Sequence, residues 1–299
     1  MKKIKDNSVA LSVWSPPYFV GKNYESYLDF EGWKELLRTV IKEHTRVLKP
    51  GSFLAINIAD ILAFPDESIP RFQADVVSAK RSGITREMVL QAQSDNPHMN
   101  RYQLAKLLGC SEQTIHRRIA NNNVRGGKAQ VQTRVQTVGG MLEAFAQEAG
   151  LPMYDRRIWV KDPTWANSRW HSSSYRAVDE FEYIYIFWKP GITKVDRNRL
   201  NKNEWSEWGS RAVWNFRSVR SNHDHEAKFP LELPLRLIRM LTEPDGLILD
   251  PFMGSGTTGV AAIQTQREFI GIEKEEKYVE LANLNCQQAM VRFTRLSCS

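Results

Sequence analysis

The sequence is poor in cysteine and has no long apolar run. Its three cysteines, Cys110, Cys286 and Cys298, form no C-x-x-C pair, which argues against a thiolate zinc cluster. A sparse and odd cysteine count is typical of a reducing compartment. No apolar stretch approaches the roughly 20 residues that cross a bilayer, and none of signal-peptide length follows the basic start. These absences predict a soluble cytoplasmic protein without a zinc cluster.

The composition suits a folded domain with a modest preference for a polyanionic partner. Hydrophobic residues make up 42% of the 299 residues, which is enough for a sizeable core. This length accommodates one large domain, or one domain with a small insertion. The net charge is +7, but the basic residues are spread along the chain. Charge alone therefore raises the expectation of a nucleic-acid partner only modestly.

Apolar runs of strand length alternate with segments of helical spacing. We expect strands at 9–14, 53–58, 156–161, 182–188, 247–250 and 268–272, and helices at 31–48, 139–149, 233–241, 276–294 and from Thr257 onward. The polar stretch 191–213 is expected to be loop. This alternation predicts an α/β fold with a doubly wound, mostly parallel sheet. A polar and basic stretch over 65–137 is interpreted as an insertion into a domain formed by 1–64 and 138–299.

The segment GLILDPFMGSGTT, from Gly246 to Thr258, predicts a ligand-binding turn. An apolar strand ends at Asp250 and leads through a glycine turn into a helix, as at the carboxyl edge of doubly wound sheets. The Asp250 carboxylate suits a cationic group such as an α-ammonium better than a phosphate. Glu273 ends a second strand about twenty residues later, a spacing suited to ribose hydroxyls. The alternative is a nucleotide-binding fold with an ordinary glycine turn, which the absence of a Walker lysine disfavours.

A second turn, Ser15-Pro16-Pro17-Tyr18, follows the first strand and lies at a sheet edge. An exocyclic amine on an aromatic ring is a weak nucleophile, because its lone pair is delocalised into the ring. Contacts of the amine with the Pro16 carbonyl and the Ser15 hydroxyl would localise that pair. Tyr18 offers a ring on which an extruded base can stack, and holding the amine against a sulfonium methyl supplies rate through proximity. The alternative is a turn that merely ends a strand.

Together these two motifs resemble those of the amino-group DNA methyltransferases. Residues 250–258 are similar to the cofactor motif of that family, and residues 15–18 to its catalytic motif. Serine at the first catalytic position is the usual form in members that methylate cytosine N4, whereas members acting on adenine N6 usually have an acidic residue or Asn there. The order of the motifs resembles the permuted beta group. The resemblance covers 1–60 and 139–295.

The resemblance implies the S-adenosylmethionine-dependent methyltransferase fold and transfer of a methyl group to cytosine N4 of a flipped base in double-stranded DNA. It is compatible with a cognate restriction endonuclease as a partner. It assigns cofactor contacts to Asp250, Pro251, Phe252, Gly254, Ser255, Gly256, Thr257, Glu273, Phe229 and Pro230, with His225 near the last two. The alternatives are an adenine-N6 enzyme, a methyltransferase for RNA or a protein amide, and a DNA-binding regulator without catalysis.

Two departures from the family pattern concern the ends of the site. Family members usually have a Gly-Asp dipeptide near the cofactor adenine, before the catalytic turn, where this chain has Asp6-Asn7-Ser8. The usual target-recognition stretch, which precedes the segment at Trp214, is short. We therefore expect another part of the chain to read the DNA sequence.

Residues 101–119, within the insertion, have helix-turn-helix spacing. Leu104, Leu108, Ile115 and Ile119 would form a small core, with Ala105 at the helix crossing, Gly109 in the turn and Ser111 as cap. The exposed face of the second helix then offers Ser111, Gln113, Thr114, Arg117 and Arg118 to a major groove. Residues 98–135 include seven Lys or Arg but one acidic residue, a balance that suits phosphate contacts. The alternative is a helical hairpin that only packs on the catalytic domain.

Two weaker signals are left open. Trp159, Trp165, Trp170 and Trp188, with Arg156, Arg157 and Arg169, could line a DNA cleft, but aromatic residues at this density more often form core. His223 and His225 could suggest a metal. With no further ligand in register, we interpret them as part of a loop.

Overall fold

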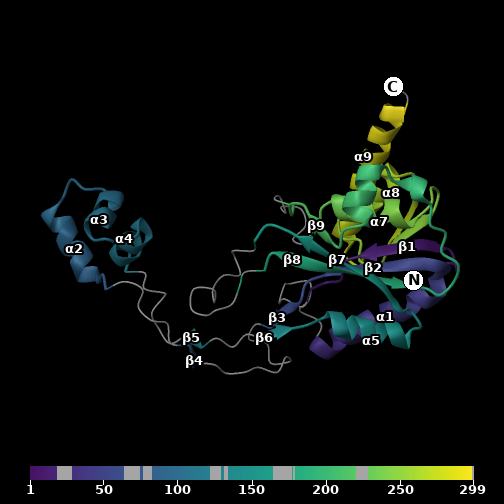
Figure 1. Ribbon diagram of the computed structural model, residues 1–299, viewed down its shortest axis with the longest axis horizontal. Helices are drawn as coiled ribbons and strands as arrows, with labels where there is room; N and C mark the ends of the chain where they lie inside the picture. The colour runs from purple at the N-terminus through teal and green to yellow at the C-terminus, as the bar shows by residue number, and fades with distance from the viewer. Residues whose placement is uncertain are drawn as a thin grey trace. The chain divides into compact units, whose positions relative to one another are not determined.

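The computed structural model describes residues 1–18, 29–63, 75–76, 83–121, 129–130, 134–163, 177, 179–219 and 228–297. The chain divides into two compact units (Figure 1). The first comprises Met1–Arg71, Thr133–Pro163 and Glu180–Ser299, and the second comprises Phe72–Gln132 and Thr164–Asp179. The insertion predicted over 65–137 contains the first segment of the second unit, whereas Thr164–Asp179 has no counterpart in that prediction.

A seven-stranded sheet forms the centre of the first unit. In spatial order its strands are β11 (Glu268–Gly271), β10 (Leu247–Asp250), β1 (Val9–Trp14), β2 (Leu48–Ile58), β8 (Phe181–Trp188), β7 (Met153–Val160) and β9 (Val213–Asn215). Among these described strands β8 alone is reversed, because it pairs antiparallel with β2 and β7 while the other neighbours pair parallel. The predicted α/β fold with a mostly parallel sheet is confirmed.

The register of the sheet brings strand ends that are distant in sequence to one rim. Ser12 lies opposite Leu249, so β1 and β10 end side by side. On its other side β1 pairs with β2. Since β8 is reversed, its first residues lie at this same rim, with Tyr183 opposite Ile58. The segments that follow β1, β10 and β11 and the beginning of β8 therefore share the edge at which doubly wound sheets bind ligands.

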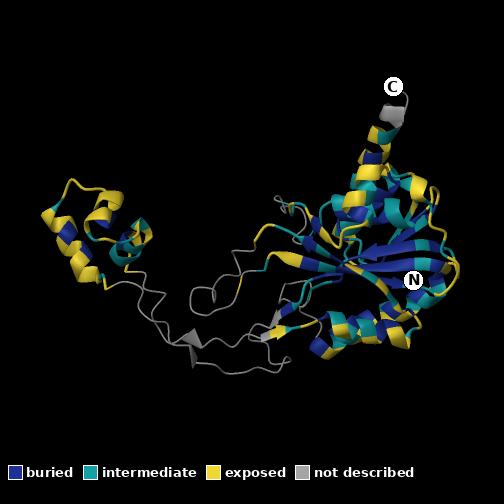
Figure 2. Cartoon of the chain, viewed as in Figure 1, coloured by how far each residue is buried: buried dark blue, intermediate teal, exposed yellow. Residues whose placement is uncertain are grey.

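Helices cover both faces of the sheet (Figure 1). The helices α1 (Phe30–Val47) and α5 (Gly139–Glu148) pack on one face, α7 (Glu232–Leu241) and α8 (Thr257–Gln264) on the other, and α9 (Glu276–Ser297) packs on α8. Figure 2 shows that burial is concentrated in the strands and on the inner sides of these helices. The two faces form two apolar cores, one on each side of the sheet.

Helix α1 illustrates how the sequence determines these elements. Asp29 caps its first turn by accepting a hydrogen bond from the Gly32 N–H at 2.7 Å. Trp33, Leu37 and Ile41 recur every four residues and are almost fully buried, so one stripe of the helix faces the sheet. Burial of each such side chain contributes about 1.5–3 kcal/mol. The helix predicted at 31–48 is confirmed, although its last predicted residue already belongs to β2.

The expectation of a loop over 191–213 is wrong. This stretch contains the short helical elements η3 (Arg197–Arg199), α6 (Lys202–Glu204) and η4 (Trp205–Gly209). Asn201 and Glu204 form a capping box that starts α6, and the elements are too short to show helical periodicity. Trp208 is buried under the guanidinium of Arg236, whose central carbon lies 5.2 Å from a ring centroid of Trp208.

The second unit contains three helices among its described residues, α2 (Arg86–Asp95), α3 (Arg101–Leu107) and α4 (Glu112–Ile119). Their shared core comprises Val89, Ala92, Leu104, Ala105 and Ile115, with Leu108 and Ile119 partly buried against it. Gly109 has a φ of +62° in the turn between α3 and α4, a conformation that glycine adopts without strain. The helix-turn-helix spacing thus corresponds to two packed helices, which α2 extends to a bundle of three.

Two short antiparallel ladders lie along the path into and out of the second unit. In the first unit, β3 (Ile61–Ala63) pairs with β6 (Arg134–Gln136). In the second, β4 (Asp75–Val76) pairs with β5 (Ala129–Gln130). The departing and returning parts of the chain are therefore hydrogen-bonded to each other twice. The proposed division at 65 and 137 stays a prediction. Among the described residues, every helix is too short or too polar to cross a bilayer.

Candidate active site

The turn after β10 is organised by the carboxylate of Asp250. Asp250 is 1% exposed, and its two oxygens accept hydrogen bonds from the Phe252 N–H at 3.0 Å and the Thr258 hydroxyl at 2.7 Å. Burial raises the pKa of Asp250 to about 7, and the two hydrogen bonds oppose this rise. Asp250 thus holds both ends of the turn together from beneath. A direct contact between its carboxylate and a cationic ligand stays a prediction.

Glu273 joins the same turn to the end of β11. Its carboxylate accepts hydrogen bonds from the backbone N–H of Gly254 at 3.0 Å, of Lys274 at 2.8 Å and of Glu275 at 3.1 Å. A carboxylate has about four acceptor positions, so capacity remains for a ligand hydroxyl. The Glu273 side chain is half-buried beside the glycine turn, and its predicted contact with ribose hydroxyls stays a prediction.

Close packing fixes the backbone of the turn. Gly256 has a φ of +82°, and a Cβ placed there would lie 2.9 Å from the Cβ of Ala282. The Asn285 side chain donates to the Ser255 carbonyl at 2.9 Å, so α9 supports the turn from behind. Glycine is therefore required at 256 both for its left-handed conformation and for this close approach.

The turns after β1 and β10 meet through aromatic contact. The ring of Trp14, the last residue of β1, lies 5.3 Å from that of Phe252. Beneath them the Ser12 hydroxyl lies 3.0 Å from the Leu249 carbonyl and 2.8 Å from Nε2 of His44. Burial lowers the pKa of His44 to about 4. The two motifs, some 230 residues apart in sequence, thus lie at the same rim of the sheet.

Hydrogen bonds hold the catalytic turn predicted at 15–18. The Ser15 hydroxyl lies 2.9 Å from the Asn57 carbonyl and 3.0 Å from the Tyr18 hydroxyl. The Trp33 indole donates to the Pro17 carbonyl at 2.8 Å. Within the described part of the chain, nothing donates to the Pro16 carbonyl. The turn therefore fixes Pro17 and Ser15 and leaves the Pro16 carbonyl as an acceptor.

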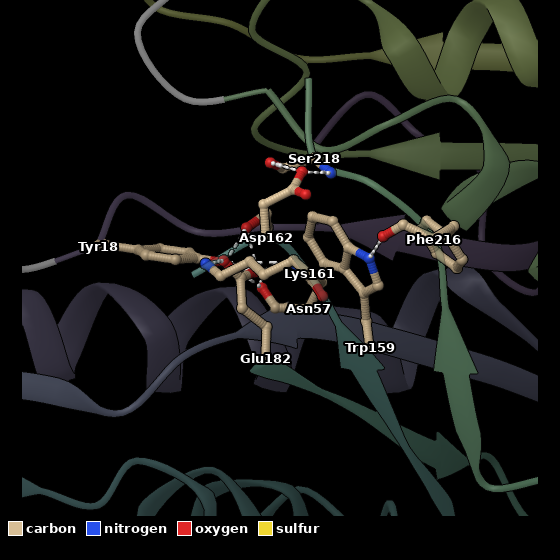
Figure 3. A network of polar contacts seen from close by, with 9 residues as sticks. Tyr18, Asn57, Trp159, Lys161, Asp162, Glu182, Phe216 and Ser218 are labelled. Atoms are coloured by element: carbon tan, nitrogen blue, oxygen red, sulfur yellow. Dashed lines mark hydrogen bonds and ion pairs between the residues drawn. The ribbon is translucent and has the colours of Figure 1, made fainter. Parts of the chain in front are cut away.

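A buried charged network continues from this turn (Figure 3). The Tyr18 hydroxyl lies 2.7 Å from Oε2 of Glu182, which also accepts from the Asn57 amide at 2.6 Å. Lys161 forms an ion pair with the other carboxylate oxygen. Glu182 is 6% exposed. Asn57, Lys161 and Glu182 were not among the predicted site residues, although a polar residue in the apolar strand 53–58 was a usable signal.

A second aromatic contact lies next to this network. The rings of Trp159 and Phe216 stack with centroids 5.4 Å apart, and the Trp159 indole donates to the Phe216 carbonyl at 2.8 Å. Asp162 accepts from both the N–H and the hydroxyl of Ser218 (Figure 3). Trp159 is 2% exposed, which agrees with the interpretation of this tryptophan as core. Trp165, Trp170 and Arg169 lie outside the described residues.

Comparison with known proteins determines the family. The family model described as DNA methylase, which covers the N6 and N4 methyltransferases, matches residues 9–284. The chain belongs to this family. The predicted membership of the beta group of amino-methyltransferases is confirmed, and S-adenosyl-L-methionine is the methyl donor of this DNA methylase.

Relatives and solved structures agree with this assignment. The chain is 58% identical over 287 residues to the type II methyltransferase M.BglI of Bacillus subtilis, and the match covers 96% of this DNA methylase and 82% of the relative. It superposes on a Thermus thermophilus protein, described as a DNA modification methylase and complexed with S-adenosyl-L-methionine, with TM-score 0.62 and 23% identity over 97% of this chain and 89% of that one. It also superposes on the PvuII cytosine-N4-specific DNA methyltransferase, with TM-score 0.57 and 17% identity over 98% of this chain and 87% of that one. These two structures show the shared fold.

The remaining predicted cofactor residues of this DNA methylase lie in the turn after β10 or just before α7. Pro251, Gly254, Ser255 and Thr257 are part of the turn itself. Phe229 packs against the core of the α7 face, and the Pro230 carbonyl accepts from the Leu233 N–H at 3.1 Å in the first turn of α7. His223 and His225 lie outside the described residues. Within the described part of the chain, no group of three or more His, Cys, Asp or Glu could hold a metal ion.

The predicted DNA-reading helix is α4. Ser111 caps it by accepting from the Thr114 N–H at 3.3 Å, and Gln113 is exposed while Arg117 is half-buried. Arg118 is half-buried like Arg117, and its predicted contact with DNA stays a prediction. Its Nε donates to the Ile84 carbonyl at 2.8 Å, before α2, because Arg118 is one residue from the buried edge of α4 and its long side chain reaches back to the bundle.

Proposed function

We propose that this DNA methylase transfers the methyl group of S-adenosylmethionine to N4 of a cytosine flipped out of double-stranded DNA at a specific sequence. The observation that supports this most directly is the contact of Trp14 with Phe252, at 5.3 Å between rings. It places the Ser15 turn next to the Asp250 turn. A methyl donor held by one turn and an amine held by the other would then be neighbours, and proximity of this kind supplies rate.

The residues of the Ser15 turn have the chemistry that an exocyclic amine needs. The Ser15 hydroxyl and the Pro16 carbonyl are acceptors that can bind the two N–H groups of the amine and localise its lone pair on nitrogen. The phenol of Tyr18 is held at its hydroxyl, so its ring has a fixed orientation for stacking on an extruded base. S-adenosylmethionine supplies an activated methyl group. These residues position the amine that accepts this group and bind its N–H groups.

We assign the cofactor to the surface around the turn after β10. Gly254, Ser255 and Gly256 allow close approach of the backbone, Glu273 has acceptor capacity for ribose hydroxyls, and Phe229 with Pro230 would contact the methionine part. Asp250 holds the turn in place through its hydrogen bonds to Phe252 and Thr258. Its carboxylate would also attract the ammonium of the cofactor. These roles rest on the local geometry and on the similarity of the motif to that of the family.

The identity of the methylated base is the part of the proposal that depends on Ser15. We expect DNA methylated by the enzyme, digested to nucleosides and separated by chromatography with mass detection, to contain N4-methylcytidine in its deoxy form. The control is the same DNA incubated without S-adenosylmethionine. N6-methyldeoxyadenosine as the product would instead support the adenine-N6 alternative.

We further propose that α4 reads the DNA sequence for this enzyme. Three observations support it: a capped helix, an exposed Gln113 next to Thr114, and Arg117 on the side opposite the buried Ile115. Such a helix has the size and polarity of one that enters a major groove. A restriction endonuclease partner stays a prediction, which the type II names of the relatives support.

Arg117→Ala is expected to relax sequence choice while S-adenosylmethionine binding stays unchanged. Loss of one good base contact costs about 1–3 kcal/mol of discrimination. Methylation of oligonucleotides with single substitutions in the recognition site measures this, with Arg86→Ala on α2 as the matched control. An unchanged site preference in Arg117→Ala would exclude a base-reading role for this residue.

A further inference from the structure

The hydrogen bonds around Ser15 form a network in which one group determines which atoms donate. Ser15 contacts Tyr18 and Asn57, and both of these contact the Glu182 carboxylate. An ionised carboxylate accepts hydrogen bonds and donates none. The direction in which protons point in the network therefore follows from Glu182.

The protons can be assigned one at a time. Tyr18 has a single proton and lies 2.7 Å from Glu182 Oε2 but 3.4 Å from the Asn57 carbonyl, and the shorter bond to a charged acceptor is the stronger one. Tyr18 thus donates to Glu182. The Asn57 amide has two protons, one for Glu182 at 2.6 Å and one for the Tyr18 oxygen at 3.1 Å.

Ser15 then has only acceptors around it. Its one proton points to the Asn57 carbonyl at 2.9 Å or to the Tyr18 oxygen at 3.0 Å. In both cases the proton is used within the protein, and the lone pairs of the Ser15 oxygen remain for another partner. A hydroxyl in this state accepts a hydrogen bond from an amine N–H and does not donate one to it.

We propose that Glu182 is a positioning residue that acts through Tyr18 and Asn57 to make Ser15 a hydrogen-bond acceptor for the target amine. The proposal rests on the proposed function of the Ser15 turn. Lys161 belongs to the same network, because its ammonium binds the second carboxylate oxygen of Glu182. It would therefore determine the orientation of an uncharged amide placed at position 182. Glu182 is almost completely buried, and its carboxylate bonds Tyr18, Asn57 and Lys161, none of which is a predicted cofactor residue.

Glu182→Gln tests this direction with a side chain of the same shape. Beside the Lys161 ammonium the glutamine would turn its oxygen to Lys161 and its NH₂ to Tyr18. The Asn57 amide, which donates to Glu182 in the wild type, would then turn its Oδ1 toward this NH₂. Tyr18 would then accept, its proton would point to Ser15, and Ser15 would lose acceptor capacity. We expect the single-turnover rate of methyl transfer to fall about ten- to a hundredfold, with the Kd of S-adenosylmethionine and the KM for DNA unchanged. Tm should fall, because the Lys161 ammonium loses its buried counter-charge. Glu180→Gln, which is exposed two residues earlier, is the matched control.

Two double variants distinguish the proposed positioning role of Glu182 from a purely structural role. In Glu182→Gln/Lys161→Met the glutamine oxygen is free to return to Tyr18 and Asn57, so the rate should recover at least half of the loss on a logarithmic scale. In a Tyr18→Phe background Glu182→Gln should change the rate less than twofold. A double variant as slow as Glu182→Gln, or a full loss in the Tyr18→Phe background, would overturn the proposal. The experiment measures total methyl transfer, so its result does not depend on whether the methylated base is cytosine or adenine.

Discussion

Ser15→Ala is expected to lower the rate constant of methyl transfer about a hundredfold or more, the effect typical of removing one fixed hydrogen-bond partner of the reacting group. The substitution removes the side-chain acceptor while Trp33 still holds the turn through the Pro17 carbonyl. Binding of S-adenosylmethionine should be unchanged, since the cofactor turn after β10 keeps its own hydrogen bonds. Single-turnover transfer of a labelled methyl group to DNA, with calorimetry for the cofactor, measures both quantities.

The matched control is Ser8→Ala, before the start of β1. The Ser8 hydroxyl bonds the Lys5 carbonyl at 2.6 Å, and Ser8 lies at the rim of the sheet opposite to Ser15, because it precedes the strand that Ser15 follows. It should keep the wild-type rate. If Ser15→Ala retained more than a third of the wild-type rate constant, Ser15 would have no role as acceptor, and the proposed choice of cytosine N4 would lose its main support.

Gly256→Ala is expected to weaken S-adenosylmethionine binding about tenfold or more. A left-handed conformation costs a non-glycine residue about 1–2 kcal/mol, so the free turn should relax away from it. Binding must then restore the wild-type conformation at this cost, and about 1.4 kcal/mol corresponds to tenfold in affinity. The new Cβ would also lie 2.9 Å from the Ala282 Cβ, so the turn must move away from α9. Titration calorimetry gives the affinity, and a lower Tm should accompany the loss.

Gly140→Ala is the appropriate comparison for Gly256→Ala. Gly140 lies in the first turn of α5, has no positive φ, and a Cβ there would meet no atom within 4 Å. Alanine should be neutral or slightly stabilising in this helix. Equal cofactor affinities in the two variants would show that the turn after β10 tolerates displacement and does not form the binding surface.

The elements best predicted from sequence are those whose signals are local. The strand at 247–250, its terminal Asp250 and the following glycines lie within one short segment, and the structure shows the strand, the left-handed Gly256 and the start of α8 as expected. The helix at 31–48 has a strong apolar period and was predicted nearly to the residue. Each motif was placed at a sheet edge because it follows a strand, and the parallel pairing of β1 with β10 brings both to the same rim.

What sequence could not provide depends on contacts between distant segments. Glu182 and Lys161 became site residues because β8 is reversed and pairs with β7, with Trp159 opposite Glu182, and periodicity contains no information on strand direction. The hydrogen bond of Arg118 to the Ile84 carbonyl, 34 residues earlier, is a contact of this kind. Likewise the short helices near Trp208 depend on packing against Arg236 of α7.

The pairing of β3 with β6 has a consequence for how such enzymes diversify. It brings residues 61–63 and 134–136 to adjacent positions on one ladder, so the intervening chain leaves the catalytic domain and re-enters it at nearly one point. Ends this close allow a whole bundle to be excised, transplanted or replaced by another without altering any strand of the central sheet. A chimera with a foreign bundle between these two strands should therefore keep the same chemistry and acquire a different target sequence.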